Sequence, residues 1–234
     1  MSAAPAADCR PPEGLERESV RFVIDGDTLR LKNGRDVRLI GLDTPELDHG
    51  KGEDKPFARA ARSALERLVD RAGGEILLRP GVDSRDRYRR RLAHIYSPDG
   101  DNLTAALLRL GLGFQAVVAP NLAHIDCYRM AESEARKAGR GLWRAGVNDA
   151  AAVTDPGFHL LKGRVAKVGQ SRQSVWLNLD GGVDVKVPHA VWQAMTSEKP
   201  EAFVERHLEV RGWFYRHRGK LRVRVSHSAS IQWQ

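Results

Sequence analysis

Two short runs of acidic residues in the first fifth of the chain have the composition of a cation site. Asp25-Gly26-Asp27-Thr28 comes first, and Asp43-Thr44-Pro45-Glu46 follows after a basic residue, Arg38. Carboxylates that converge with carbonyl and water oxygens bind hard cations such as Ca²⁺ or Mg²⁺. We therefore expect a hard-cation site, provided that the elements carrying Asp27 and Asp43 lie side by side.

The residues around these runs predict strands that would bring them together. Apolar residues alternate with polar ones at 20–24, 29–31 and 37–39, and the intervening segments carry turn signals. This pattern predicts a three-stranded meander, with Asp27 at the start of one strand and Asp43 at the end of another. Arg38 alternates with Val37 and Leu39, so it faces away from their core side and toward the carboxylates.

Helices and further strands are predicted after the meander. Helical spacing over 57–71 ends at Gly73-Gly74, and strand-like runs follow at 75–78 and 91–96. Asn102 is suited to cap a second helix that ends near Leu110, and a third is expected over about 125–137. Strands with segregated helices predict an α+β, mainly β layout for this part.

The last third of the chain has a different pattern. A polar segment of small side chains predicts a linker over 146–157, and an amphipathic segment at 190–204 separates the third and fourth of five strand-like runs. Those runs are at 160–168, 175–179, 183–187, 208–214 and 221–225. This layout predicts a small five-stranded barrel of the OB type, and an SH3-like barrel, which also has five strands, is the alternative.

Four sequence runs resemble staphylococcal nuclease and the wider thermonuclease family, in the family's order and near its spacing, over about residues 17–143. The runs are VIDGDT at 23–28, RLIGLDTPE at 38–46, DRYRRRLAHIY at 86–96 and GLW at 141–143. The part after residue 157 is similar to C-terminal extensions of some bacterial thermonuclease-like proteins.

The resemblance implies a Ca²⁺-dependent phosphodiesterase that acts on DNA and RNA with little sugar specificity, built on an OB-type barrel with three helices. Matched by motif position, Asp27 and Asp43 would ligate Ca²⁺ with the Thr44 carbonyl, and Glu46 would be the general base or orient the water. Arg38 and Arg90 would bind the scissile phosphate, and Arg87 and Tyr88 would contact the terminal phosphate.

General chemistry supports these roles, because hydrolysis of an anionic phosphodiester needs charge neutralisation and a positioned water. Guanidinium groups match phosphate oxygens in geometry. The chain departs from the family at Arg89, where a glycine is common, and at Val117 and Ala119, where staphylococcal nuclease has base-stacking tyrosines. These departures support an alternative function, a non-catalytic nucleic-acid-binding protein that uses the nuclease fold as a platform.

Charge is distributed unevenly between the predicted parts, which are an arm at 1–16, a nuclease-like domain at 17–145, a linker at 146–157 and a basic domain at 158–234. Residues 1–157 carry 25 basic and 24 acidic residues, whereas 158–234 carry 13 and 6. Basic residues with interleaved aromatic rings are typical of single-strand binding on OB folds. A candidate accessory surface consists of Arg211, Trp213, Tyr215, Arg216, Arg218, Lys220 and Arg222. The alternative is that Trp213 and Tyr215 are core residues and the arginines ordinary surface charge.

The two cysteines, Cys9 and Cys127, are expected to form one disulfide, and two unrelated thiols are the alternative. Ala3–Ala7 resemble the small-residue end of a secretory signal, although the apolar region that normally precedes it is missing. We interpret this segment as the remnant of a secretory signal and expect export to the periplasm or the medium. The alternative is that the start of the sequence is merely rich in alanine. No apolar run approaches the roughly 18 residues of a membrane-spanning helix, and no obligate protein partner is evident.

Overall fold

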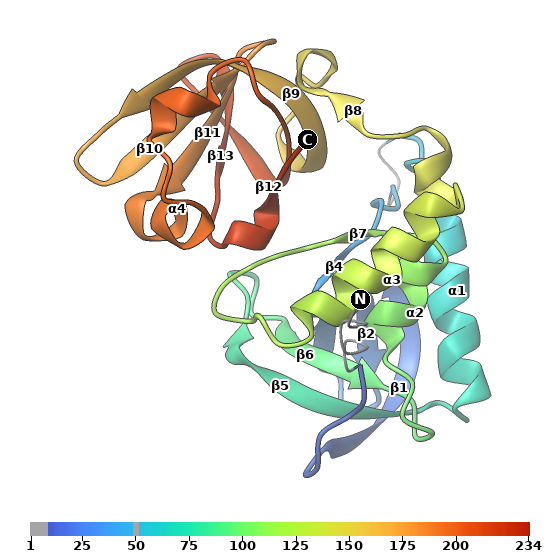
Figure 1. Ribbon diagram of the computed structural model, residues 1–234. Helices are drawn as coiled ribbons and strands as arrows, with labels where there is room; N and C mark the ends of the chain where they lie inside the picture. The colour runs from blue at the N-terminus through green and yellow to red at the C-terminus, as the bar shows by residue number, and fades with distance from the viewer. Residues whose placement is uncertain (1–8, 49–51) are drawn as a thin grey trace, which may run out of the picture. The chain divides into compact units, whose positions relative to one another are not determined.

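The computed structural model describes residues 9–48 and 52–234, and its two units are each built around a barrel (Figure 1). The first unit comprises the chain up to Ala116 together with Pro120–Arg144. The second unit comprises Val117–Ala119 and Ala145–Gln234.

Five strands close the barrel of the first unit, in the order β1-β2-β3-β6-β5. Their bounds are Glu16–Asp25 for β1, Thr28–Leu31 for β2, Asp36–Leu39 for β3, Glu75–Arg85 for β5 and Arg91–Tyr96 for β6. All neighbouring pairs are antiparallel except β3 and β6. The alternating apolar residues that predicted strands fill the interior, where Leu29, Leu31, Val37, Leu39 and Ile95 are buried.

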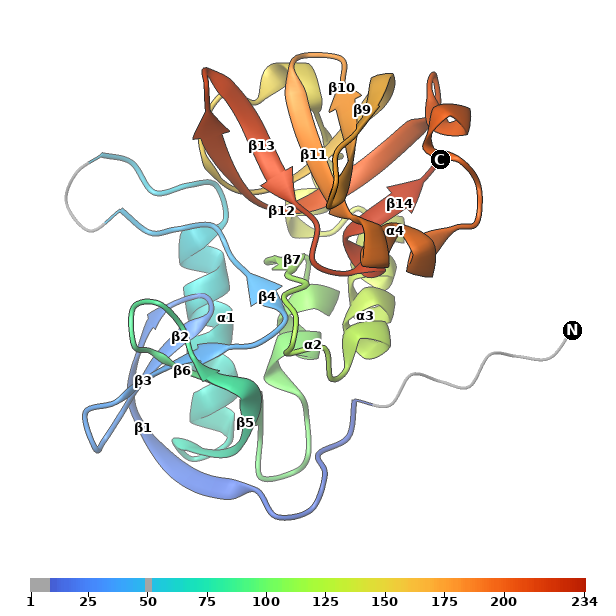
Figure 2. The same ribbon diagram turned by 90° about the vertical axis from the view of Figure 1, so that its left-hand side faces the viewer.

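Three helices lie beside this barrel: α1 (Ala58–Arg71), α2 (Leu103–Arg109) and α3 (Ile125–Lys137) (Figure 2). As expected, the side chain of Asn102 caps α2 by accepting a hydrogen bond from the backbone of Ala105. A 3-10 turn, Gly141–Arg144, follows α3. The helices and the barrel share one apolar core.

A two-stranded sheet holds the segment that carries the second acidic run. β4 (Leu42–Asp43) pairs with β7 (Phe114–Gln115), which places Asp43 opposite Phe114. The hydroxyl of Thr104 donates a hydrogen bond to the carbonyl of Ile40, which lies just before β4. Gly41 has a φ of +84°, and a Cβ there would lie 2.3 Å from the Tyr128 ring. Only glycine fits this close approach, which seats the segment against α3.

The second unit has the same strand order as the first. Its closed barrel runs β9-β10-β11-β13-β12, with β12 pairing back onto β9 and a parallel pair between β11 and β13. The bounds are Gly157–Gln170 for β9, Ser174–Leu179 for β10, Val183–Pro188 for β11, His207–His217 for β12 and Lys220–Arg224 for β13. Helix α4 (His189–Met195) and a 3-10 turn (Pro200–Phe203) stand between the third and fourth strands.

Both barrels therefore have the strand order first, second, third, fifth, fourth, with a helix after the third strand. This order and helix position confirm the prediction of an OB-type nuclease barrel with three helices followed by a second five-stranded OB-like barrel.

The segment expected to be a linker is partly structured. β8 (Asn148–Asp149) pairs in parallel with Leu161–Lys162 of β9, and Ala150, in the 3-10 turn Ala150–Ala152, is fully buried in the second core. A short C-terminal strand, β14 (Ile231–Trp233), also joins β12. Runs of two or three residues show too little alternation to be recognised in the sequence.

Within the described residues, no helix has the length and apolar character needed to cross a membrane. The predicted arm at 1–16 lies partly outside the described residues, which begin at Cys9. Glu16 already belongs to β1.

Cys9 and Cys127 form a disulfide, which confirms the predicted pairing, and their Cα atoms lie 5.5 Å apart. Cys127 is on α3 and buried, and Cys9 packs against the same core. The bond ties the start of the described chain to a helix 118 residues later.

Reducing this disulfide is expected to lower the free energy of unfolding by about 3 to 5 kcal/mol, because closing a loop of this length restricts the unfolded chain strongly. Urea unfolding of the protein with and without reductant measures the difference. The Cys9→Ala/Cys127→Ala variant is the control, since its unfolding should not respond to reductant. An unchanged midpoint of urea unfolding for the reduced wild-type protein would show that the disulfide does not stabilise the fold.

Candidate active site

A buried cluster of two carboxylates and one guanidinium joins the two acidic runs. Arg38 Nη1 donates to Asp27 Oδ1 at 2.6 Å, and Arg38 Nη2 donates to Asp43 Oδ1 at 2.8 Å. The side chains of Arg38, Asp27 and Asp43 are 12%, 3% and 15% exposed. One arginine thus bridges the carboxylates from β4 and from the turn before β2.

The turn between β1 and β2 fits against α1 because it contains a glycine. A Cβ at Gly26 would lie 2.6 Å from the Ala61 Cβ and 2.7 Å from the Thr44 hydroxyl, so a larger residue would force the turn away. The close fit lets the Thr44 backbone donate to Asp27 Oδ2 at 3.3 Å. Thr28 also donates to Asp27, at 2.9 Å.

The carboxylates of this cluster have raised pKa values. Burial raises the pKa of Asp27 well above its ordinary value, and Arg38 opposes this while Asp25 and Asp43 add to it. Burial, opposed by Arg38 and assisted by Glu46, raises the pKa of Asp43 to about 6. Glu46 itself is exposed. The site therefore gathers more negative charge than Arg38 alone can neutralise.

The donor set suits a hard cation. Among residues 9–48 and 52–234, no group of three or more His, Cys, Asp or Glu side chains is arranged to hold a metal. A site built from two aspartates and a backbone carbonyl needs only two such side chains, and its oxygen donors are those that Ca²⁺ prefers. Burial is the main cause of the raised pKa values of Asp27 and Asp43, and Arg38 offsets it only in part.

Arg90 lies apart from the cluster in the turn between β5 and β6. Its Nε donates to Asp86 Oδ2 at 2.7 Å, and no hydrogen bond or ion pair among the described residues joins it to Asp27, Arg38 or Asp43. Leu92, two residues later, pairs with Arg38 across β6 and β3. The sheet thus brings the turn to the strand beside Arg38, and the Nη groups of Arg90 have no protein acceptor in the described chain.

Asp86 organises this turn. Its Oδ1 accepts hydrogen bonds from the backbones of Tyr88 and Arg90, both at 2.9 Å. The guanidinium groups of Arg87 and Arg90 lie over the Tyr88 ring, at 4.8 and 5.4 Å from its centroid. The three residues expected to bind phosphate, Arg87, Tyr88 and Arg90, therefore lie side by side. The Tyr88 side chain is 65% exposed.

Arg89 stands where a glycine is common in the family, and its backbone adopts a left-handed conformation. Its φ is +67°, in the left-handed region that favours glycine, and its amide donates to the Asp86 carbonyl at 2.9 Å. A side chain in this conformation costs about 1 to 2 kcal/mol.

Replacing Arg89 by glycine is expected to raise the free energy of unfolding by about 0.5 to 1 kcal/mol, because the relief of strain exceeds the added freedom of the unfolded chain. Urea denaturation measures this gain. Arg89→Ala keeps the strained φ and should give no comparable gain. Equal stabilisation by both variants would show that the Arg89 side chain, rather than the backbone, is unfavourable.

The candidate accessory surface is only partly an exposed surface. Trp213 and Tyr215 are 42% and 43% exposed, whereas Phe214 between them is buried. The alternative that Trp213 and Tyr215 are core residues is therefore wrong. Arg211 is buried, and Arg216 donates to the Thr154 carbonyl at 2.6 Å. Arg218 and Lys220 flank the turn between β12 and β13 and are exposed.

Cross-strand pairing adds residues that sequence reasoning did not assign to this surface. Tyr215 pairs with Arg222, whose guanidinium lies 4.5 Å from the centre of the Trp176 ring and also donates to Asp184. Lys186 lies over the same ring at 5.4 Å. We call the exposed or half-buried set of Trp176, Lys186, Trp213, Tyr215 and Arg222 the aromatic face. Trp176 and Lys186 lie on β10 and β11, so only the strand register could reveal them.

Comparisons with known proteins place the first unit in a family. The profile of the family described as Staphylococcal nuclease homologue matches residues 36–145. Endonuclease YncB of Bacillus subtilis (strain 168) is 34% identical over 140 residues, which are 58% of this chain and 64% of that protein. The match therefore covers slightly less than two thirds of YncB.

Two further relatives show how far the similarity extends. The thermonuclease of Staphylococcus intermedius is 31% identical over 127 residues, covering 53% of this chain and 74% of that protein. Endonuclease YhcR of Bacillus subtilis (strain 168) is 25% identical over 208 residues, covering 82% of this chain and 17% of that protein. The chain belongs to the staphylococcal nuclease homologue family.

Proposed function

We propose that this protein is a Ca²⁺-dependent nuclease that hydrolyses the phosphodiester bonds of DNA and RNA with little sugar specificity. The observation that carries the proposal is the buried Asp27–Arg38–Asp43 cluster, with Glu46 close enough to raise the pKa of Asp43. The names of the relatives, endonuclease and thermonuclease, agree with this chemistry.

Asp27 and Asp43, with the carbonyl of Thr44, would hold the cation. When bound, Ca²⁺ would supply positive charge against the phosphate oxygens and lower the cost of charge build-up in the transition state. Buried, mutually repelling carboxylates support this assignment, since a divalent cation would relieve the shortage of positive charge described above.

Glu46 would take the proton from the attacking water or orient that water. Its exposed carboxylate follows directly after the segment that holds Asp43 and Thr44, so it has access to solvent. General-base assistance of this kind contributes about 10² to 10⁴-fold to a rate.

Arg38 and Arg90 would bind the scissile phosphate. Arg90 is held at Nε by Asp86, which leaves both Nη groups available for phosphate oxygens. Arg38 donates to one oxygen of each carboxylate through Nη1 and Nη2, and its remaining N–H groups are available for a phosphate. Arg87 and Tyr88, next to Arg90, would contact the terminal phosphate.

The absence of tyrosines at 117 and 119 predicts weaker nucleotide binding at the catalytic site, because each lost base stack is worth about 1 to 3 kcal/mol. We propose that the second barrel compensates by holding the substrate on its aromatic face. The disulfide is compatible with an exported protein, and we propose a periplasmic or secreted location without an obligate protein partner.

The aromatic face gives a prediction that separates stacking from general surface effects. Trp213→Ala/Tyr215→Ala is expected to weaken binding of single-stranded DNA about 10-fold or more, since two stacking rings are lost. Fluorescence anisotropy in the presence of chelator measures the affinity. Phe22→Ala, which removes a ring 46% exposed in the first unit, is the control. Equal affinities for all three proteins would exclude stacking on this face.

Digestion of three substrates tests the proposed activity. Single-stranded DNA, duplex DNA and RNA are each incubated with the purified chain in Ca²⁺, and the products are resolved by electrophoresis. Shortening of both DNA and RNA supports a nuclease with little sugar specificity. Retarded but intact nucleic acid would favour the alternative, a binding protein that retains the nuclease fold without its activity.

A further inference from the structure

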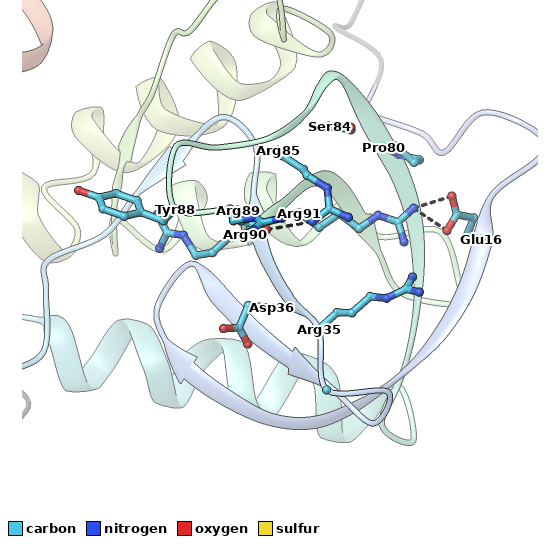
Figure 3. Close-up of a pocket in the computed structure, with 11 residues that line it drawn as sticks. Glu16, Arg35, Asp36, Pro80, Ser84, Arg85, Tyr88, Arg89, Arg90 and Arg91 are labelled. Atoms are coloured by element: carbon cyan, nitrogen blue, oxygen red, sulfur yellow. Dashed lines mark hydrogen bonds and ion pairs between the residues drawn. The ribbon is translucent and has the colours of Figure 1, made fainter.

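A cavity of about 750 Å³ lies at one end of the first barrel, and its lining is dominated by arginine (Figure 3). The turn between β2 and β3, the end of β5 and the start of β6 meet there. Arg35, Arg85, Arg89, Arg90 and Arg91 line the cavity, opposed by two carboxylates, Glu16 and Asp36. Its volume lies within the usual range of small-molecule sites.

Both carboxylates already have basic partners. Glu16 accepts two hydrogen bonds from Arg91, each at 2.6 Å. Asp36 is bonded to Arg30, a residue that does not line the cavity. Neither carboxylate is therefore left to neutralise the other arginines.

Three arginines of the cavity have no acidic partner among the described residues. Arg85 donates only to the Arg89 carbonyl, at 3.3 Å, and the guanidinium groups of Arg35 and Arg89 have no hydrogen bond or ion pair there. Figure 3 shows Arg35 and Arg85 among the arginines that line the cavity, together with Arg91. Like charges that line one cavity repel one another, so an anion bound among them would be stabilised.

The cavity is distinct from the carboxylate cluster. Asp27, Arg38, Asp43 and Glu46 are not among the residues that line it. Arg90 lines the cavity and is also the second candidate ligand of the scissile phosphate. A strand bound at Arg90 would therefore have its neighbouring phosphates near Arg35, Arg85 and Arg89.

We infer that this cavity is an anion subsite that binds backbone phosphates of the nucleic-acid strand next to the phosphate under attack. The inference rests on the proposed function and extends it to Arg35 and Arg85, which lie outside the four runs that resemble the family. Several guanidinium forks around one cavity match a polyanion with regularly spaced phosphates better than a single carboxylate ligand.

The test is the binding of a fluorescein-labelled eight-nucleotide deoxythymidine strand in chelator, where no Ca²⁺-dependent cleavage occurs. Arg35→Gln/Arg85→Gln is compared with the control Arg67→Gln/Arg71→Gln, which removes two exposed arginines of α1 that lie outside the cavity. All proteins also carry Trp213→Ala/Tyr215→Ala, so that the aromatic face does not mask the effect. Thermal unfolding confirms that each variant is folded.

The cavity variant is expected to bind about 10-fold more weakly than its parent at roughly 0.1 M salt. The slope of log affinity against log salt should decrease by about 1.4, as expected for two lost contacts to single-stranded phosphates. The control should change neither quantity by a comparable amount. Equal losses in both variants, or none in the cavity variant, would overturn the subsite.

This outcome is independent of catalysis. If the parent binds the strand in chelator but fails to cleave it in Ca²⁺, the proposed nuclease activity fails while the comparison of the variants still decides the subsite. If cleavage occurs and the cavity variant binds like its parent, the activity stands and the subsite is wrong.

Discussion

Replacing Glu46 by glutamine is expected to lower kcat by about 10² to 10⁴-fold, with little change in KM. The amide cannot accept the proton of the attacking water, whereas Arg38, Arg90 and the cation-binding carboxylates remain in place. Because Glu46 is exposed, the free energy of unfolding should stay within about 0.5 kcal/mol of wild type. Steady-state cleavage of a labelled DNA in Ca²⁺, beside urea denaturation, measures both quantities.

The matched control is Glu53→Gln, which removes an exposed carboxylate from the same loop region without touching the cluster. It should retain the wild-type rate. A kcat for Glu46→Gln within about threefold of wild type would exclude the general-base role and leave Glu46 as an ordinary surface charge.

Replacing Arg38 by glutamine is expected to affect both activity and stability. The change removes the only side-chain cation bonded to Asp27 and Asp43 in the described structure, and leaving buried carboxylates unpaired costs about 3 to 5 kcal/mol. Cleavage should fall at least about 100-fold, since one phosphate-stabilising donor is lost. Urea denaturation and cleavage assays on the same preparation measure the two losses.

Two variants separate the buried charge from a general effect of losing an arginine. Arg30→Gln breaks the more exposed pair with Asp36 on the neighbouring strand and should cost less than about 1 kcal/mol. Adding Asp43→Asn to Arg38→Gln should recover part of the lost stability but none of the activity, because a neutral amide replaces an unpaired charge. Equal destabilisation by Arg38→Gln and Arg30→Gln would contradict this account of the cluster.

The sequence was informative wherever periodicity and turn chemistry act locally. Alternation of apolar residues predicted the strands of both barrels, and the capping role of Asn102 marked the start of α2. Gly26 lies in a predicted turn and Gly41 within a family run, but the need for glycine at both positions comes from the close approach of Ala61, Thr44 and Tyr128, which are distant in sequence. Such contacts are defined only by the closed barrel and its helices.

Features that depend on register were beyond prediction from one sequence. The aromatic face joins Trp176, Lys186 and Arg222 from three strands, and the pairing of those strands decides which side chains share a surface. The run of arginines at 89–91 likewise gave no sign that Arg91 of β6 would bind Glu16 of β1, which is 75 residues earlier in the sequence. The short β8 is recognisable only through its partner in β9.

Arg89 illustrates a different limit. Arg89 stands where a glycine is common in the family, yet its backbone adopts the left-handed conformation that favours glycine, in a turn that the Asp86 side chain holds through three hydrogen bonds. Local preference was therefore overridden by a small network that the sequence alone did not single out.

The most direct test of the cluster of Asp27, Arg38, Asp43 and Glu46 is whether cleavage depends on Ca²⁺. Cleavage of one end-labelled single-stranded DNA by the purified 234-residue chain is followed in buffered Ca²⁺, then after addition of chelator, and again after Ca²⁺ is restored. We predict cleavage in Ca²⁺, arrest in chelator and recovery when Ca²⁺ returns. An equal rate in chelator, or no cleavage by folded protein in Ca²⁺, would contradict the proposed site.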